Sequence, residues 1–210
     1  MKQPMKIWTG LVGYSKKQIY QFNSRKLKTR LIEVTGYNSN LVTFDNIKTG
    51  KTEGEAWAAN IRIAVINQLM QNKSVENLIY IDSDSIIRKD FGDFNGIMED
   101  ADIRIRMRDQ LKERGRVSVG TIFFNNTKNT RDFTKIWLKS SRGKLKTWFT
   151  DQLQFYRTMM KMPHVKIRHL STRYLGTSLR DNDYVWNGKS KIKFQDERYL
   201  AEYNKYRRGK

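Results

Sequence analysis

The sequence predicts an α/β fold in which a single domain is built around a mixed, mostly parallel central sheet. A strand pattern over Met5–Val12, a helix pattern over Glu55–Gln71 and a second strand pattern at Leu78–Ile81 follow one another, an order that favours layers of helix and sheet. The run Leu78–Ile81 is apolar, bounded by polar residues and too short for a helix, so it suits a buried, parallel central strand. The length of 210 residues suits one domain with its own core.

The elements before Leu78 are predicted from turn residues and periodicity. The first strand ends at Gly10 and Gly13, and two short strands, Arg30–Val34 and Leu41–Phe44, flank a Gly-Tyr-Asn turn. Apolar residues then repeat at four-residue intervals through the first predicted helix. Its inward-facing residues are expected to be Trp57, Ile61, Val65 and Leu69.

Strands and helices also alternate in the second half of the chain. Apolar and basic residues alternate strictly over Asp102–Arg108, which predicts a half-buried strand, and Val117–Asn125 is a further strand. Thr130–Leu138 is expected to be a helix with Phe133, Ile136 and Trp137 facing inward. A second helix, Thr150–Lys161, is expected to have its first residue as N-cap, and Val165–Leu170 to form a strand.

Composition excludes two kinds of site. Cysteine is absent, so the chain has neither a disulfide framework nor a thiolate metal site, which fits a reducing cytoplasm. The first residues do not resemble a signal peptide, and no run approaches the roughly 20 apolar residues that cross a membrane. We therefore expect a soluble, cytoplasmic protein without a membrane span.

The charge is large and unevenly distributed. The formal net charge is +20, yet residues 81–100 contain six acidic and only two basic residues, whereas residues 101–210 contain 27 basic and ten acidic ones. A field this positive favours a polyanionic partner such as DNA, RNA or an anionic membrane surface. The alternative is a basic protein that has no such partner.

Two carboxylates stand directly after the predicted central strand, in the acidic segment. Asp82 and Asp84, separated by Ser83, can both reach a hard divalent cation there, because ligands of open α/β sheets bind beyond the carboxyl ends of strands. A bound cation would neutralise a diphosphate and stabilise it as a leaving group. The alternative is a polar turn that closes the strand.

These residues resemble a known family. The segment Leu78–Ile87, with the sequence LIYIDSDSII, resembles the Asp-x-Asp strand of nucleotide-diphospho-sugar transferases with the GT-A fold. Three later segments are similar to that family in the same order: Gly120–Thr127, Thr150–Leu153 and Val185–Lys191. The resemblance implies a single Rossmann-like GT-A domain over residues 1–194, followed by a basic, aromatic tail over 195–210.

The resemblance also implies roles for individual residues. Asp84 would contact Mg²⁺ or Mn²⁺ directly, and Asp82 would face the donor's ribose or the metal through water. Lys189, beside Gly188, would contact the diphosphate of a UDP-sugar. The donor-binding set implied in this way is Thr9, Gly10, Asp82, Ser83, Gly120, Thr121, Gly188 and Lys189.

The third metal ligand has two candidates. The family often has a histidine before the glycine of its C-terminal segment, and here that position is Asn187, whose carbonyl oxygen can ligate a cation. His169, at the end of a predicted strand, is the reserve candidate.

Asp151 is the candidate general base. If the enzyme inverts the anomeric configuration, a carboxylate must take the acceptor's proton, and the resemblance places Asp151 near the acceptor hydroxyl. If the enzyme retains the configuration, no such base is required. An acid in the first turn of a helix is also stabilised by the helix dipole alone.

Two clusters of basic residues are candidates for contacts with nucleic acid. Three arginines share one face of the predicted strand: Arg104, Arg106 and Arg108. Their spacing of about 6–7 Å matches a phosphate backbone, although a solvated strand face would look the same. The second cluster, Arg142, Lys144 and Lys146, precedes Trp148 and Phe149, a mixture that suits DNA unless both rings are core.

Together these features favour a metal-dependent glycosyltransferase that moves a sugar from a UDP-sugar to a hydroxymethylated pyrimidine in DNA. Enzymes of this kind are typical of bacteriophages, which would place the protein in the host cytoplasm. The resemblance leaves a cell-envelope polysaccharide or glycolipid as an alternative acceptor. A non-catalytic nucleic-acid-binding protein is the other alternative, with the Asp-x-Asp pair a mere turn.

Overall fold

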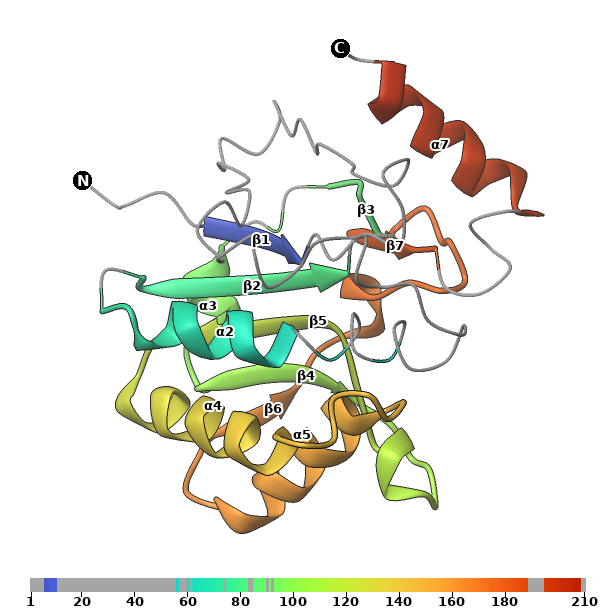
Figure 1. Cartoon of the computed structure of the whole chain (residues 1–210). Helices are drawn as coiled ribbons and strands as arrows, with labels where there is room; N and C mark the ends of the chain where they lie inside the picture. Colours follow the sequence, from blue (N-terminus) through green and yellow to red (C-terminus); the bar gives the residue numbers. More distant parts are fainter. Residues whose placement is uncertain are drawn as a thin grey trace.

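The computed structural model describes residues 6–10, 56, 60, 62–73, 75–82, 85–89, 91, 93–188 and 195–208. Within this part of the chain, a five-stranded sheet has the spatial order β1-β2-β5-β4-β6 and carries helices on both faces (Figure 1). The strands are β1 (Lys6–Gly10), β2 (Asn77–Asp82), β4 (Ile103–Met107), β5 (Val117–Asn125) and β6 (Ile167–His169).

The sheet is mixed, but the prediction that it is mostly parallel is wrong. β1 is parallel to β2 and β6 is parallel to β4, whereas β5 is antiparallel to both of its neighbours. A separate pair, β3 (Ser85–Ile87) with β7 (Val185–Asn187), is also antiparallel, so antiparallel pairs predominate among the described strands. The cause is the connection from β4 to β5. Residues 108–116 reverse the chain with one short turn, η4 (Glu113–Gly115), and lack the crossover helix that a parallel neighbour needs.

Each face of the sheet has its own apolar core. On one face, α2 (Arg62–Gln71), α4 (Lys128–Ser141) and α5 (Thr150–Lys161) pack over β2, β4 and β5 (Figure 1). On the other face, α3 (Phe94–Met98) and a segment around Leu170 cover Ile79, Ile81 and Phe123. The fold thus has three layers, and β2 and β5 are buried on both sides.

The periodicity of apolar residues predicted the helices, but it did not predict correctly every residue that faces the core. In α2 the buried residues are Ile63, Ile66 and Met70, while the predicted Val65 and Leu69 are half-buried and Trp57 and Ile61 lie outside the described residues. In α4, Phe133 and Trp137 are buried as predicted, but Ile136 is 39% exposed. A strict four-residue repeat drifts around a helix of 3.6 residues per turn, so the buried stripe follows steps of three and four instead.

Helix α5 begins at Thr150, as predicted, but Thr150 is not its N-cap. The capping position is Phe149, whose backbone is in the left-handed region with φ 65°. The Thr150 hydroxyl instead donates to the Lys144 carbonyl at 2.8 Å, which ties the preceding loop to the helix start.

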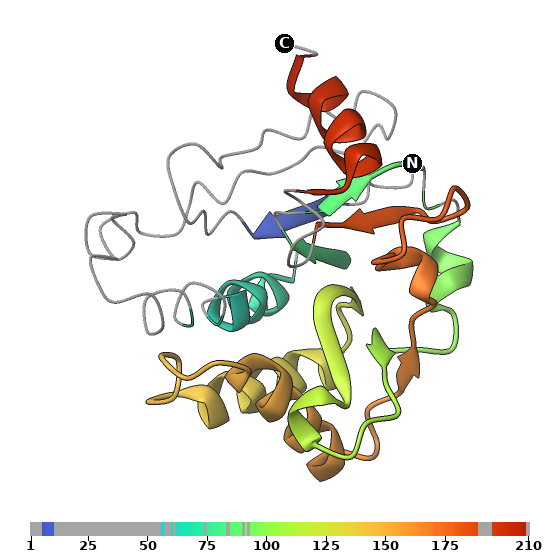
Figure 2. The same ribbon diagram turned by 90° about the vertical axis from the view of Figure 1, so that its right-hand side faces the viewer.

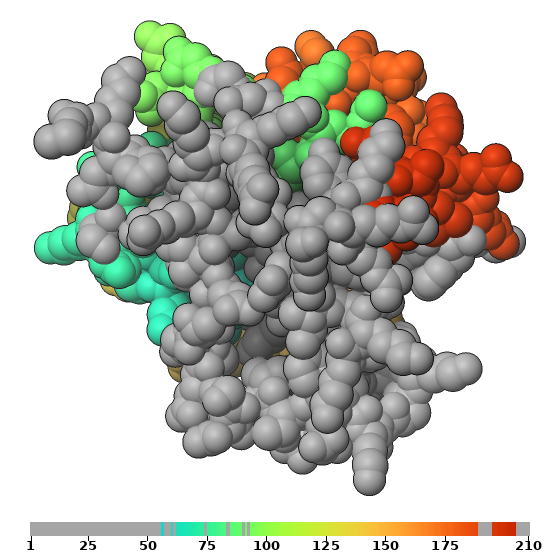
Figure 3. Space-filling model, turned by 90° about the horizontal axis from the view of Figure 1, so that it is seen from above, coloured from blue at the N-terminus to red at the C-terminus, as the bar shows by residue number. Residues whose placement is uncertain are grey.

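The C-terminal part of the described chain forms a small separate cluster beside the main sheet. The tail forms α7 (Glu197–Arg208), which lies over the β3–β7 pair and packs Tyr199 against Ile86, Leu179 and Trp186 (Figure 2). Seen from above, α7 and α2 lie on opposite sides of the molecule (Figure 3). The strands predicted at 30–34 and 41–44 lie outside the described residues.

Among the described helices, none has both the length and the apolar character needed to cross a membrane.

Candidate active site

A pocket of about 150 Å³ opens where β2 ends and the β4–β5 ladder is interrupted. Ile105 pairs with Ile122, but the next residue of β4, Arg106, pairs with Ser118, so three residues of β5 have no partner on β4. Such bulges often lie next to active sites, because they bend a strand and redirect its side chains. Two of the three unpaired residues, Val119 and Gly120, line the pocket.

Residues far apart in the sequence meet in this pocket. Arg62 comes from α2, Asp82 from the end of β2, and Asp151 and Gln152 from the first turn of α5. The remaining lining residues come from the loops and strands around them: Arg108, Ser118, Trp148, Phe149, Leu175, Thr177 and Asn187.

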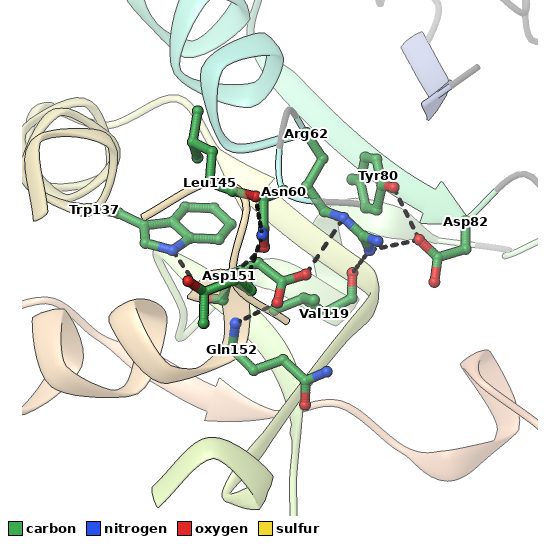
Figure 4. A network of polar contacts seen from close by, with 10 residues as sticks. Asn60, Arg62, Tyr80, Asp82, Val119, Trp137, Leu145, Asp151 and Gln152 are labelled. Atoms are coloured by element: carbon green, nitrogen blue, oxygen red, sulfur yellow. Dashed lines mark hydrogen bonds and ion pairs between the residues drawn. The ribbon is translucent and has the colours of Figure 1, made fainter. Parts of the chain in front are cut away.

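Asp82 is held by two donors. The Arg62 guanidinium (Nη1) lies 2.6 Å from Asp82 Oδ1, and the Tyr80 hydroxyl donates to the same oxygen at 2.8 Å (Figure 4). A Cβ atom on Gly120 would stand 2.9 Å from Asp82 Oδ2, so the glycine leaves the space that this carboxylate occupies. The fixed position of Asp82 therefore depends on all three neighbours.

Tyr80 acts in this site as a hydrogen-bond donor. Burial raises its pKa well above the ordinary value, and the negative charge of Asp82 raises the pKa further, although the positive charge of Arg62 opposes the shift. Tyr80 consequently stays protonated at neutral pH and keeps donating its hydrogen bond to Asp82.

Asp151 is buried and anchored at every polar atom. Its Oδ2 lies 3.5 Å from Arg62 Nε, and its Oδ1 accepts from the Gln152 backbone N–H at 2.7 Å. The Asp151 backbone donates to the Asn60 side chain at 3.0 Å and accepts from the Trp137 indole at 3.0 Å (Figure 4). These contacts hold the Asp151 side chain in one rotamer in the wall of the pocket.

Arg62 is a central residue of the pocket that was not predicted from the sequence. It bridges Asp82 and Asp151, donates to the Val119 carbonyl at 3.4 Å and lies 5.3 Å from the centre of the Tyr80 ring. One sequence signal could have found it: Arg62 is the only charged residue in α2, whose sequence is RIAVINQLMQ. A lone charge at the start of an otherwise uncharged helix needs a partner.

An Arg62→Met variant is expected to lose about 3–5 kcal/mol in free energy of unfolding, because two carboxylates would lose their shared cation while staying mostly buried. Arg62→Lys should lose less, since it keeps the charge but not the planar fork. Urea unfolding followed by circular dichroism measures both. As a control, Arg157→Met breaks a half-exposed pair with Glu113 and should cost at most about 1 kcal/mol. A change at Arg62 no larger than this control would contradict the bridging role.

Asn187, the predicted third ligand, lines the same pocket as Asp82. It is 4% exposed, and its side-chain nitrogen donates to the Ser85 hydroxyl at 3.0 Å, which leaves its carbonyl oxygen for a ligand. Gly188 follows it and is buried. The reserve candidate His169 is exposed on β6, does not line the pocket, and its Nδ1 accepts from the Met107 backbone N–H at 3.3 Å.

The other predicted donor-binding residues divide into three groups. Thr9 and Gly10 pair in register with Ile81 and Asp82, so the end of β1 lies beside the end of β2. Thr121 is fully buried and does not line the pocket, unlike Gly120. Ser83 and Lys189 lie outside the described residues, as does the predicted metal ligand Asp84.

The donor set near Asp82 fits a hard divalent cation. The described residues contribute a carboxylate from Asp82 and an amide carbonyl from Asn187, both oxygen donors of the kind Mg²⁺ and Mn²⁺ take. Within the described ranges, no three acidic, histidine or cysteine side chains cluster closely enough to hold a metal. A complete site would therefore depend on Asp84.

The predicted basic strand face is largely engaged within the protein. Arg104 pairs with Asp100 at 2.5 Å and donates to the His169 carbonyl, and Arg106 reaches the Leu175 carbonyl at 3.5 Å. Arg108 lines the pocket. The second cluster, Arg142, Lys144 and Lys146, is exposed on the loop that leads to Trp148.

Known proteins resemble this chain in structure but not in sequence. Neither a scan against protein-family models nor a search of curated proteins found a match. A glycosyltransferase involved in the glycosylation of the major capsid of PBCV-1 is similar, with a TM-score of 0.53 and 12% identity over 97% of this chain and 98% of that one.

Two further solved structures share the fold. The galactosyltransferase LgtC, in complex with donor and acceptor sugar analogues, has a TM-score of 0.50 and 12% identity over 96% of both chains. The apo form of the glycosyltransferase GlyE from Streptococcus pneumoniae TIGR4 has a TM-score of 0.53 and 9% identity over 98% of this chain and 60% of that one. At such identities the likeness shows the fold, which is the GT-A type that the sequence resemblance implies.

Proposed function

We propose that the protein is a glycosyltransferase that takes a sugar from a nucleotide-sugar donor. The observation that carries this proposal is the Asp82–Arg62–Asp151 bridge inside a pocket at the end of β2, in a chain with the fold of known glycosyltransferases. A bridge of this kind presents fixed donors and acceptors to a small polar ligand at low solvent exposure. Such preorganised groups stabilise charge that develops during a reaction.

The residues around the pocket suggest how a donor would be held. The end of β1, beside Asp82, would face the nucleotide, while Asp82, Asn187 and Asp84 would supply oxygen ligands. A divalent cation bound there, Mn²⁺ or Mg²⁺, would neutralise the diphosphate leaving group. Gly120 provides a wall without a side chain against which a sugar can lie. Lys189 would add a positive charge near the diphosphate.

Asp151 would act as the base for the acceptor hydroxyl. It reaches the pocket from α5, and its carboxylate is held by Arg62 and by its own helix. A carboxylate in the pocket lining could take a proton from a bound hydroxyl group. In a retaining enzyme the same carboxylate would orient the substrates only.

For the acceptor we propose a hydroxymethylated pyrimidine in DNA. The support is the exposed basic loop over residues 142–149, which ends in Trp148 and Phe149, exposed by 42% and 41% at the pocket. Basic side chains for phosphates beside rings for an unstacked base form the usual platform for a nucleic-acid strand. Because Arg104 and Arg106 bond to groups within the protein, we propose that this exposed loop makes the DNA contacts.

Duplex binding is expected to weaken steeply with salt, by about 0.9 log unit of affinity per log unit of salt for each phosphate contact. The double variant Arg142→Glu, Lys144→Glu should lower DNA affinity for all sequences and leave UDP-sugar turnover unchanged. Fluorescence anisotropy at several salt concentrations measures the first effect. An acceptor screen with UDP-sugars and Mn²⁺, using hydroxymethylated beside unmodified DNA, measures transfer. Transfer to an envelope glycan, without transfer to hydroxymethylated or unmodified DNA, would show that the acceptor is a glycan. DNA binding that does not depend on salt would contradict the proposed DNA interface.

A further inference from the structure

Arg108 is a positive charge in the pocket without a counter-charge. Among the described residues, no carboxylate lies within ion-pair distance of its guanidinium, and the group makes no side-chain hydrogen bond. By contrast Arg62, in the same pocket, binds two carboxylates. Arg108 therefore lacks the internal partner that its pocket neighbour has.

The surroundings of Arg108 make an unpaired charge costly. The side chain is half-buried. Its burial, and to a smaller extent repulsion from the charge of Arg106, lowers the pKa of Arg108 from its ordinary value. A guanidinium in this position is stabilised when an anion enters the pocket and replaces the water it has lost.

Two aromatic rings, those of Trp148 and Phe149, line the same pocket as Arg108. Trp148 and Phe149 are 6.3 Å apart between ring centres, and the exposed Arg114 lies 5.3 Å from the centre of the Phe149 ring. Phe149 keeps its place despite a left-handed backbone with φ 65°, a conformation that is unfavourable for a residue with a Cβ. Strain of this kind often marks a side chain that is positioned for a ligand.

Arg108 and Asp82 enter the pocket from different segments. Arg108 follows β4, whereas Asp82 stands at the end of β2. A donor whose diphosphate lies at Asp82 and Asn187 would leave Arg108 and the two rings for the second substrate. Asp151 and Gln152, both on α5, line the same pocket.

We infer that Arg108, Trp148 and Phe149 form an acceptor subsite in which the guanidinium binds a backbone phosphate and the rings stack on the base of the target nucleotide. The inference rests on the proposed function and names the groups that would recognise its acceptor. Exposed Arg114, Arg142 and Lys144 beside the subsite favour an extended polyanion over a single anionic sugar, since they continue the positive surface beyond the pocket.

The test uses three variants and two DNA probes. Arg108→Gln removes the charge, Arg108→Lys keeps it, and Arg198→Gln removes one exposed charge on α7, outside the pocket, as a matched control. The probes are one oligonucleotide containing 5-hydroxymethylcytosine and a copy with a neutral methylphosphonate beside that nucleotide. Affinity is measured by fluorescence anisotropy, and donor hydrolysis is measured separately without acceptor.

Arg108→Gln is expected to weaken binding of the charged oligonucleotide about 10- to 100-fold, as loss of a hydrogen bond to a charged group does. Arg108→Lys should weaken it less, and Arg198→Gln should match wild type. With the methylphosphonate probe, wild type and Arg108→Gln should bind alike. Phe149→Leu should weaken both probes equally, because the ring contacts the base and not the phosphate.

Several results would overturn the subsite. An Arg108→Gln protein that binds the charged probe like wild type, or that loses equal affinity for both probes, excludes the phosphate contact. A loss of donor hydrolysis in Arg108→Gln would place the residue at the diphosphate instead. Arg108-dependent transfer to a uronic-acid oligosaccharide, with no binding of DNA, would assign the subsite to an anionic glycan. Arg108-dependent DNA binding without turnover of any nucleotide sugar would keep the subsite and remove the proposed function.

Discussion

The Asp82→Asn variant is expected to keep its fold and to lose sugar-donor turnover by about 10²–10³-fold, the usual effect of removing one fixed electrostatic contact from an active site. Asparagine still accepts hydrogen bonds from Arg62 and Tyr80, but it removes the negative charge that faces the pocket beside Gly120. Asp84→Asn, in the same motif, is expected to abolish turnover, because that carboxylate is the proposed direct metal ligand. Initial rates with a UDP-sugar at limiting Mn²⁺ measure both variants.

Asp181→Asn is the matched control for this prediction. Its side chain is fully exposed and lies near Arg88, outside the pocket, so the same chemical change should leave the rate unaltered. The free energy of unfolding of Asp82→Asn should fall by only about 1–3 kcal/mol, the cost of weakened hydrogen bonds to a charged group. Wild-type turnover by Asp84→Asn at limiting metal would remove the cation site from the account.

Asp151→Asn is expected to lower kcat by about 10²–10⁴-fold while changing donor affinity little, if the carboxylate takes the acceptor proton. The amide has nearly the same shape and can still accept from the Gln152 N–H, so the packing of α5 around Trp137 should survive. Transfer rates under saturating donor and acceptor measure kcat, and titration of the donor without acceptor measures its affinity.

A purely structural role for Asp151 predicts a different outcome. The variant would lose one carboxylate of the Arg62 bridge and, in addition, the roughly 0.3–1 kcal/mol that a charge in the first turn contributes through the helix dipole, so it would melt earlier and react at the normal rate. Thermal unfolding and kcat measured on the same preparation separate the two roles. An unchanged kcat excludes Asp151 as the base.

The sequence predicted the elements that carry the site because their signals are local. The apolar run at β2 and the carboxylate after it are contiguous, and β5 was predicted with its full bounds, Val117–Asn125. The resemblance to a family, through segments in the same order along the chain, also predicted that Asn187 and Asp82 belong to one site although they are 105 positions apart. In the structure both residues line one pocket. Contiguous patterns and family order therefore sufficed for the framework.

What could not be predicted depends on contacts between distant segments. The direction of β5 follows from the short loop after β4, and the interruption at Val119–Thr121 that opens the pocket follows from pairing with a strand whose own register shifts. Arg62 acquires its role only when α2 packs across β2 and α5, because no local spacing links it to Asp151, 89 residues later. Likewise Arg104 looks free in the sequence, yet the fold places Asp100 and the His169 carbonyl beside it.

The most direct test of the central claim is turnover of a panel of UDP-sugars by the wild-type protein, with Mn²⁺ and with the metal chelated. Release of UDP is followed in the absence of acceptor and in the presence of hydroxymethylated DNA, with Asp82→Asn assayed alongside. We expect metal-dependent release of UDP from at least one donor, faster with acceptor and reduced about 10²–10³-fold in the variant. A wild-type protein that neither binds nor cleaves any nucleotide sugar, or a variant that cleaves it as fast as wild type, would contradict the assignment of this pocket to glycosyl transfer.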